Sequence, residues 1–327
     1  MATPYRAPYP KLRAGQMVGR DGNRFIADDD LLAAAHAALA LERPLLLTGE
    51  PGCGKTDFAF AAASGLMPPG DAAAETPKPL EQYVRSDTRA RDLLYHYDAV
   101  RRFGDSQAGG ERGRQRAEWP QNYIALEPLG EGLMSPEQRV VLIDEIDKAP
   151  RDLPNDLLRE LDQGWFEIPE IPPVQSPSQG HIEPGHAHLV RRMERPLHVP
   201  KPLVVITSNV ERQLPDAFLR RCVFFYIPFP SPARLRQIVA AHIPEADEAM
   251  RNDAVTLFSA LRDNFRLTKA PATAELLDWV KVLTTVYEPA ALKPRLAEAA
   301  RHTGAWASLP AMGCLLKLRD DFDRVVQ

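Results

Sequence analysis

The stretch GEPGCGKT at residues 49–56 decides the fold of this chain. It fits the pattern GxxxxGK[ST], whose glycines let the backbone wrap so that its N–H groups point at a phosphate. The apolar run PLLLT at residues 44–48 comes directly before it and is typical of a buried strand. A helix is predicted directly after it, and the positive end of that helix favours an anion at the loop. The stretch is therefore predicted to bind the phosphates of a nucleotide.

Individual positions of this loop have expected roles. Lys55 is expected to reach the β- and γ-phosphates, and the hydroxyl of Thr56 is expected to bind Mg²⁺. Cys53 has two interpretations, an ordinary small loop residue or a site of redox inhibition, and the second requires a lowered thiol pKa. The residues predicted to bind the nucleotide here are Glu50, Pro51, Gly52, Cys53, Gly54, Lys55, Thr56 and Asp57.

A pair of acids ends the strongest predicted strand, RVVLIDE at residues 139–145. In parallel α/β sheets, ligands bind beyond the carboxyl ends of the strands. Asp144 is expected to bind the nucleotide through its Mg²⁺, which it would hold together with Thr56. Glu145 is expected to orient and deprotonate the attacking water. Two acids at the end of a strand are common, and the phosphate loop earlier in the chain favours the catalytic interpretation.

Two later segments carry further candidate catalytic residues. Asn209 ends the predicted strand 202–209, where its amide could bind the γ-phosphate or position water, or merely form a turn. Arg220 and Arg221 precede the predicted strand 223–230. A guanidinium suits the charge that develops on a transferring phosphoryl group, although a pair of surface arginines is the plainer interpretation.

In this order, GEPGCGKT, VVLIDEIDKAP, VVITSN and LPDAFLRRC resemble the motifs of the AAA+ ATPases, most closely their MoxR-type branch. The resemblance covers roughly residues 25–290. It implies an α/β P-loop core with a parallel sheet of strand order 5-1-4-3-2, followed by an all-helical lid domain. It also implies a homo-oligomeric ring, usually a hexamer, that binds ATP and Mg²⁺ at its subunit interfaces.

The same resemblance assigns roles to single residues. Asn209 looks like the sensor-1 residue. Arg221, or Arg220 as the alternative, looks like the arginine finger that acts on the neighbouring subunit's nucleotide. The lid of this family supplies a sensor-2 arginine, and here Lys269 is the nearest cation, with Arg266 as the weaker option.

The composition changes along the chain and predicts three parts. Residues 1–24 are rich in Pro, Gly and Arg and are expected to form an N-terminal arm. Residues 25–230 are expected to form the nucleotide-binding α/β domain, and residues 231–327 the helical lid, because Ser231-Pro232 is a helix-start signal. Within the α/β domain, residues 85–135 are expected to be an irregular insert. Residues 165–202 are expected to form a long β-hairpin with a flexible tip.

The overall composition narrows the class of protein. The chain has 327 residues, a net charge of -4 and 26% charged residues, which is typical of a soluble globular protein. Its three widely spaced cysteines argue against a disulfide framework. Neither a signal peptide nor an apolar run of about 18 residues is evident. A cytoplasmic location without membrane contact is therefore expected.

The expected function is that of an ATP-hydrolysing, chaperone-like remodelling ATPase acting on a protein client. The resemblance suggests a partner with a von Willebrand factor A domain. Ser86 or Thr88 could hold Glu145 inactive until a partner binds. One alternative is a McrB-like nucleic-acid motor, which the net charge disfavours. Another is a nucleotide-gated assembly switch with little turnover, against which the intact Glu145 argues.

A basic stretch keeps the nucleic-acid alternative open. Its arginines could touch nucleic acid or an acidic peptide, or simply belong to a solvated loop. Trp119 and Tyr123 lie close by in the sequence and could grip a substrate or anchor the loop. The arginines are Arg101, Arg102, Arg112, Arg114 and Arg116.

Overall fold

A computed structural model of the chain describes residues 12, 17–20, 22, 25–67, 76–173, 182–209, 212–301, 306 and 309–326. The chain divides into two compact units. The first comprises Met1–Thr48 and Thr56–Tyr226, and the second comprises Gly49–Lys55 and Ile227–Gln327. By its contacts, the phosphate loop therefore groups with the helical C-terminal part of the chain.

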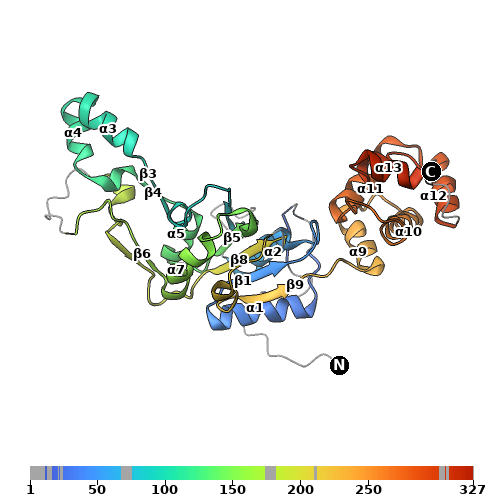
Figure 1. The fold of residues 1–327 in the computed structure, drawn as a ribbon, viewed down its shortest axis with the longest axis horizontal. Helices are drawn as coiled ribbons and strands as arrows, with labels where there is room; N and C mark the ends of the chain where they lie inside the picture. Colours follow the sequence, from blue (N-terminus) through green and yellow to red (C-terminus); the bar gives the residue numbers. More distant parts are fainter. Residues whose placement is uncertain are drawn as a thin grey trace. The chain divides into compact units, whose positions relative to one another are not determined.

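The first unit is built on a parallel sheet of five strands (Figure 1). The strands are β1 (Leu45–Thr48), β2 (Leu80–Tyr83), β5 (Val140–Asp144), β8 (Leu203–Ser208) and β9 (Val223–Tyr226). Their order is β2-β5-β8-β1-β9, which confirms the predicted order 5-1-4-3-2. Because neighbouring strands run parallel and in register, with Ile143 opposite Ile206 and Thr48 opposite Ser208, the ends of β5, β8 and β1 meet at one edge.

Helices pack on this sheet through small and apolar side chains. Helix α1 (Asp29–Leu41) starts at Asp28, whose carboxylate accepts a hydrogen bond from Leu31 N–H at 2.7 Å. Gly132 in α5 (Pro128–Met134) lets that helix approach β5, since a Cβ there would lie 2.4 Å from Val141 Cγ2. Further helices of this unit are α2 (Lys55–Leu66), α6 (Leu153–Asp156), α7 (Leu158–Gln163) and α8 (Asp216–Leu219), with the 3-10 turns η1 (Ala90–Leu93) and η3 (Ile146–Lys148).

The described residues of the N-terminal segment pack against the same unit. Leu12 and Met17 are fully buried. The backbone N–H of Val18 donates to the hydroxyl of Ser64 in α2 at 2.9 Å, and the ring of Phe25 meets that of Phe58 edge to face. Part of the predicted arm therefore contributes to the core.

Residues 85–135 are not irregular, and that prediction is wrong. Strands β3 (Tyr95–Tyr97) and β4 (Ile124–Leu126) pair antiparallel and carry helices α3 (Ala99–Ala108) and α4 (Gly110–Ala117) and the turn η2 (Pro120–Tyr123). Figure 1 shows α3 and α4 projecting from this ladder, away from the sheet. We call α3 and α4 the helical hairpin. No residue of α3 is fully buried, and its apolar residues Val100 and Phe103 are exposed, so this helix has no apolar face in the core that would distinguish it from a solvated loop.

A second antiparallel ladder lies in the segment predicted to form a long hairpin. Strands β6 (Trp165–Glu167) and β7 (Arg192–Glu194) pair over three residues each, with Phe166 opposite Met193 in the core. The turn η4 (Pro184–His186) precedes β7. The predicted tip, residues 175–181, lies outside the described residues.

The second unit is helical over its described C-terminal residues. Helix α9 starts where the sequence predicted, because the Ser231 hydroxyl accepts from Arg234 N–H and Pro232 takes the first helical position. The core of this unit centres on Phe258 and the fully buried Trp279, whose indole N–H donates to Pro310 O. In the part of the chain that is described, no helix is both long and apolar enough to span a bilayer. The helices are α9 (Pro232–His242), α10 (Glu248–Asn264), α11 (Thr273–Val286), α12 (Pro289–Arg301), η6 (Met312–Cys314) and α13 (Arg319–Val326).

Candidate active site

The phosphate loop joins β1 to α2 and needs glycine at two of its positions. Gly49 and Gly52 have φ angles of 149° and 72°, which are unfavourable for residues that carry a Cβ. A Cβ on Gly49 would lie 2.5 Å from Ile227 O, and a Cβ on Gly52 would lie 2.7 Å from the Cβ of Ala272. The glycines of the motif are therefore required by the backbone and by its close neighbours.

Lys55 folds back over this loop. Its Nζ donates to Gly49 O at 2.9 Å and to Glu50 O at 3.0 Å, and the residue is buried. Both partners are carbonyl oxygens with partial charge, so a phosphate with full negative charge is a stronger partner for the ammonium. The loop thus presents a buried cation to an anion.

Cys53 behaves as an ordinary small loop residue. Burial raises the pKa of its thiol, and the nearby Lys55 ammonium opposes this rise only in part. A reactive thiol requires a lowered pKa, so the redox interpretation loses its support.

Thr56 and Asp144 meet at the end of β5, as the sequence predicted for a shared metal shell. The Thr56 hydroxyl lies 3.1 Å from Asp144 Oδ1. Adjacent oxygen ligands of an octahedral Mg²⁺ at about 2.1 Å are themselves about 3 Å apart. The two oxygens therefore fit neighbouring positions around one magnesium ion.

Thr207 at the end of β8 connects the two acids, and the sequence analysis did not single it out. Its hydroxyl donates to Asp144 Oδ1 at 2.5 Å and accepts from the backbone N–H of Glu145 at 2.9 Å. The side chain is 1% exposed. A signal was available, because the predicted strand order sets this hydroxyl beside the end of the acidic strand.

Glu145 adopts a left-handed backbone, with φ 57° and ψ 51°, that turns its side chain out of the strand. Its Oε1 lies 3.4 Å from Asn209 Nδ2, so the structure brings these two predicted catalytic residues together. Its Oε2 lies 2.5 Å from Lys148 Nζ, a contact that the sequence analysis missed. Thr88, one of the two residues expected to restrain Glu145, instead accepts from Arg85 N–H in its own turn at 2.8 Å.

The predicted finger residues lie at the end of α8, on the surface of the first unit. Arg221 Nε donates to Asp162 Oδ2 at 2.7 Å, and its side chain is 45% exposed. Arg220 is exposed as well, and its backbone N–H caps the helix on Asp216 O. To reach a neighbouring subunit, Arg221 would have to leave Asp162.

In the second unit, Arg262 of α10 contacts the phosphate loop. Its guanidinium donates to Glu50 Oε2 at 2.6 Å and lies over the Phe229 ring, 3.6 Å from the centroid. No sequence pattern marks this residue. Lys269 has an exposed side chain, and its backbone N–H donates to Asp321 Oδ2 at 2.9 Å. Arg266 is also exposed.

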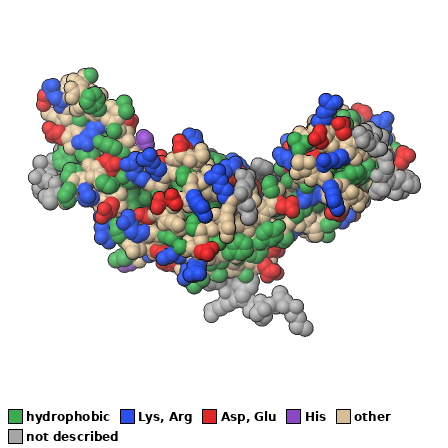
Figure 2. All heavy atoms as spheres, in the orientation of Figure 1, with side chains coloured by type: hydrophobic (Ala, Val, Ile, Leu, Met, Phe, Trp, Pro, Cys, Tyr) green, Lys and Arg blue, Asp and Glu red, His purple; other side chains and the backbone are tan. Residues whose placement is uncertain are grey.

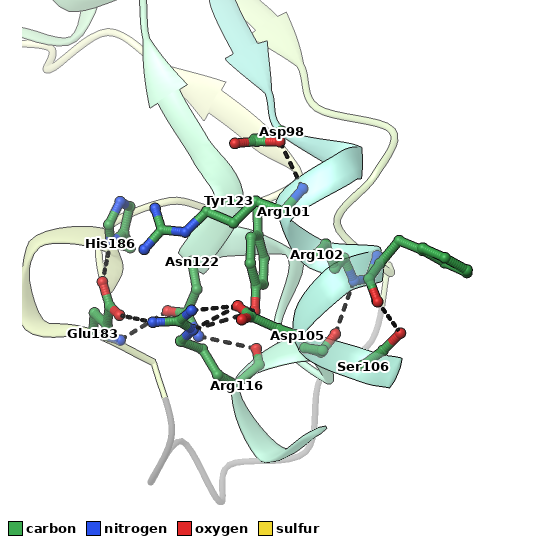
Figure 3. A network of polar contacts seen from close by, with 12 residues as sticks. Asp98, Arg101, Arg102, Asp105, Ser106, Arg116, Asn122, Tyr123, Glu183 and His186 are labelled. Atoms are coloured by element: carbon green, nitrogen blue, oxygen red, sulfur yellow. Dashed lines mark hydrogen bonds and ion pairs between the residues drawn. The ribbon is translucent and has the colours of Figure 1, made fainter. Parts of the chain in front are cut away.

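A polar network fastens the helical hairpin to its base (Figure 3). The Asp105 carboxylate accepts from Tyr123 Oη at 2.6 Å and from Arg116 Nε at 3.0 Å. The Tyr123 hydrogen bond, followed by that of Arg116, holds the pKa of Asp105 below its usual range. Arg116 also pairs with Glu183 across 3.5 Å, which ties the hairpin to the segment before η4.

This network divides the basic stretch into two kinds of residue. Arg116 and Arg102 act inside the protein, since Arg102 donates to Ala117 O at 2.8 Å and to Tyr97 Oη at 2.9 Å. Tyr123 is buried and anchors the segment, as one interpretation predicted, while Trp119 is half-buried. The exposed arginines of the stretch are Arg101, Arg112 and Arg114.

A parallel sheet in this strand order, with a phosphate loop after β1 and an acidic pair at the end of β5, defines an AAA+ P-loop ATPase. The family model of the AAA domain, dynein-related subfamily, matches residues 44–222, more than half of the chain. The chain therefore belongs to this AAA family.

Solved structures were also compared with this chain, and the similarity found is low. One match is the crystal structure of the FIGL-1 AAA domain in complex with ADP, at 17% sequence identity and a TM-score of 0.34. The match covers 80% of this chain and 64% of that one. No curated protein matches this chain.

Proposed function

We propose that this chain hydrolyses ATP at the carboxyl edge of the five-stranded sheet. The proposal rests on one observation. A chain of hydrogen bonds starts at Thr56, at the end of the phosphate loop. The Thr56 hydroxyl bonds to the Asp144 carboxylate, which accepts from the buried Thr207 hydroxyl, and that hydroxyl accepts from the backbone N–H of Glu145. This arrangement combines a metal shell with a candidate general base.

Each residue has a defined role in the proposed reaction. The loop N–H groups bind the β-phosphate, and Lys55 meets the β- and γ-phosphates. Thr56 and Asp144 would hold Mg²⁺, which when bound neutralises charge on the phosphate oxygens. Asn209 orients the attacking water or the γ-phosphate. Glu145 accepts the proton of that water, so the nucleophile is formed where Asn209 holds it.

The proposed setting is a remodelling ATPase of MoxR type that acts on a protein client as a homo-oligomeric ring. In that ring Arg221, with Arg220 as the alternative, would reach the neighbouring subunit's nucleotide. The helical hairpin would face the client, because Val100 and Phe103 on α3 are 83% and 67% exposed on a helix that polar contacts hold in place. A client with a von Willebrand factor A domain is supported by the sequence resemblance alone.

A protein client is favoured over nucleic acid. Arg102 and Arg116 are used inside the chain, and Arg114 pairs with Glu111 at 3.2 Å. Figure 2 shows Lys and Arg side chains interspersed with Asp and Glu over the visible face of the first unit. Nucleic-acid binding instead requires a basic stripe or patch.

The proposal is tested by measuring ATP turnover per subunit as the protein concentration rises. A rate per subunit that climbs with concentration supports active sites completed at subunit interfaces. Mixing Arg221→Ala with Glu145→Gln subunits should then restore part of the activity that each variant lacks. Tight ATP binding with negligible turnover at every concentration, with or without protein partners, would favour an assembly switch instead.

A further inference from the structure

A pocket opens at the carboxyl edge of the five-stranded sheet, and we call it the edge pocket. Its volume is about 330 Å³, and its walls come from the segment after β5 and the segment after β8. Asp147 in its wall accepts from the backbone N–H of Asn209 at 3.1 Å, so the edge pocket borders the candidate active site. The space can hold an aliphatic side chain. The apolar lining residues are Ile146, Ala149, Pro150, Pro154, Leu214 and Pro215.

A single leucine projects into solvent from a turn before β8. Leu197 is 90% exposed, and the backbone N–H of Val199 closes the turn by donating to Pro196 O at 3.3 Å. Arg195 holds the turn, since its side chain donates to Val199 O at 2.5 Å and its backbone N–H donates to Gly164 O at 3.1 Å. This turn, which we call the Leu197 turn, therefore presents an apolar side chain on a fixed backbone.

The Leu197 turn and the edge pocket belong to the same unit but to opposite edges of its sheet. Residues 195–201 lead into the amino end of β8, whereas residues 212–215 follow its carboxyl end. The six residues of β8, at about 3.3 Å each, set these ends about 20 Å apart. A chain therefore cannot place Leu197 in its own edge pocket, but a second copy can. A contact between two different surfaces is heterologous, and its repetition builds a ring or a filament.

The edge that carries the Leu197 turn also carries the proposed finger residue. Lys201, directly after the turn, donates through Nζ to Asp162 O at 2.6 Å. Arg221 Nε donates to the side chain of the same residue, Asp162 Oδ2, at 2.7 Å. Asp162 therefore joins the turn to Arg221. A turn that enters the edge pocket of a second copy brings Arg221 towards the candidate active site of that copy.

The charges of the two edges are complementary. Residues 195–201 and the pair Arg220–Arg221 carry four positively charged side chains and no acid. Neighbouring acids pair with two of the four. Residues 144–156 carry five acids and two positively charged side chains, and Arg212 adds a third. The first surface thus keeps an excess of positive charge and the second an excess of negative charge, which favours the approach of one copy to the other.

We propose that Leu197 of one copy inserts into the edge pocket of the next copy, so that each copy receives the Arg221 of its neighbour. This inference rests on the proposed function, because it names the contact that builds the proposed ring. An apolar centre within a polar rim is the usual arrangement of a protein interface. Burial of one leucine side chain strengthens association by about 10- to 150-fold.

The first test measures assembly by sedimentation velocity with ATP present, over a range of protein concentrations. Leu197→Ser removes the apolar side chain from an exposed position. Val190→Ser is the matched control, because Val190 is an aliphatic residue of the same unit and is 52% exposed. Leu197→Ser should need about tenfold more protein than the wild type for half-assembly, and Val190→Ser should match the wild type. Assembly of Leu197→Ser at wild-type concentrations would overturn the contact.

The second test identifies the residues that meet across the contact. A short bis-maleimide is added to a mixture of Leu197→Cys and Leu214→Cys chains, and covalent dimers are counted by denaturing electrophoresis. The mixture should give more dimer than either variant alone. Val190→Cys mixed with Leu214→Cys is the control and should give no such increase. Equal dimer in the two mixtures, or none in the first while the chains assemble, would overturn the contact.

Activity separates assembly from chemistry. The Leu197 side chain takes no part in the reaction itself, so Leu197→Ser should recover the wild-type rate per subunit at high protein concentration. Arg221→Ala should stay impaired at every concentration. A Leu197→Ser rate that remains low at concentrations where the variant is fully assembled would overturn the proposed role of Leu197.

Failure of the contact can be told apart from failure of the proposed function. If the wild type hydrolyses ATP, Glu145→Gln does not, and Leu197→Ser assembles like the wild type, only the contact is wrong. If Leu197→Cys and Leu214→Cys chains cross-link but the wild type never releases phosphate, the contact stands and the proposed hydrolysis fails.

Discussion

Replacing Thr207 with valine tests how the two acids are held. The change keeps the branched shape of the side chain and removes only its hydroxyl. Asp144 loses a donor at 2.5 Å, and the N–H of Glu145 loses an acceptor at 2.9 Å. Thr207→Ser is the matched control, since it keeps the hydroxyl and removes a methyl group.

The size of the effect follows from the burial of Thr207, which is 1% exposed. A hydrogen bond to a charged group contributes about 1.5–3 kcal/mol, and a donor left without a partner costs about 1–3 kcal/mol. Partial access of water to the Glu145 N–H lowers the sum, so about 2–3 kcal/mol is expected. If the transition state feels all of it, kcat falls about 30- to 150-fold.

Steady-state phosphate release measures this effect directly. We expect a large loss of kcat for Thr207→Val and a loss of about threefold or less for Thr207→Ser. ATP affinity should stay near that of the wild type in both, since the phosphate loop is unchanged. Equal impairment of the two variants, or a wild-type kcat in Thr207→Val, would refute the role of the hydroxyl.

Two further predictions concern the helical hairpin. Gly109→Ala would set a Cβ 2.6 Å from Asp105 O and 2.7 Å from Gly113 Cα. Residues 99–117 should therefore exchange amide hydrogens faster, while β5 and β8 keep their protection. Unchanged exchange in residues 99–117 would contradict the close packing. The pKa of Asp105 is lowered in the folded chain, so its contribution to hairpin stability is complete above the usual carboxyl range and is lost as the pH falls through the lowered value. Asp105→Asn should therefore loosen the hairpin at neutral pH. It should also remove the loss of amide-exchange protection that the wild-type hairpin shows as the pH falls. If the variant keeps that loss in full, a group other than Asp105 causes it.

The sheet could be predicted because its central strands have distinct apolar sequences. Strands β1, β5 and β8 are buried on both faces, and their apolar runs are visible without any partner. The helical hairpin could not be predicted in the same way. It is held by Asp105, Arg116 and Tyr123 and by close contact of Gly109 with Gly113, and these contacts leave no period in the sequence.

The same contrast holds within the candidate site. Asp144 and Asn209 lie at the ends of predicted strands, so a parallel sheet alone brings them to one edge. Thr56 is the last residue of the phosphate-loop motif. The contact of Lys148 with Glu145 depends on a single left-handed residue, which the sequence does not mark. Arg262 contacts Glu50 from a helix 212 residues further along the chain, and only the folded second unit reveals it.

The central claim is that this chain hydrolyses ATP with Glu145 as the general base. The most direct measurement is phosphate release by the wild type and by Glu145→Gln, with ATP binding measured on the same preparations. We predict wild-type turnover, and ATP binding of normal affinity with almost no turnover in Glu145→Gln. Turnover at the wild-type rate in Glu145→Gln would contradict the claim, as would a wild type that binds ATP and never releases phosphate.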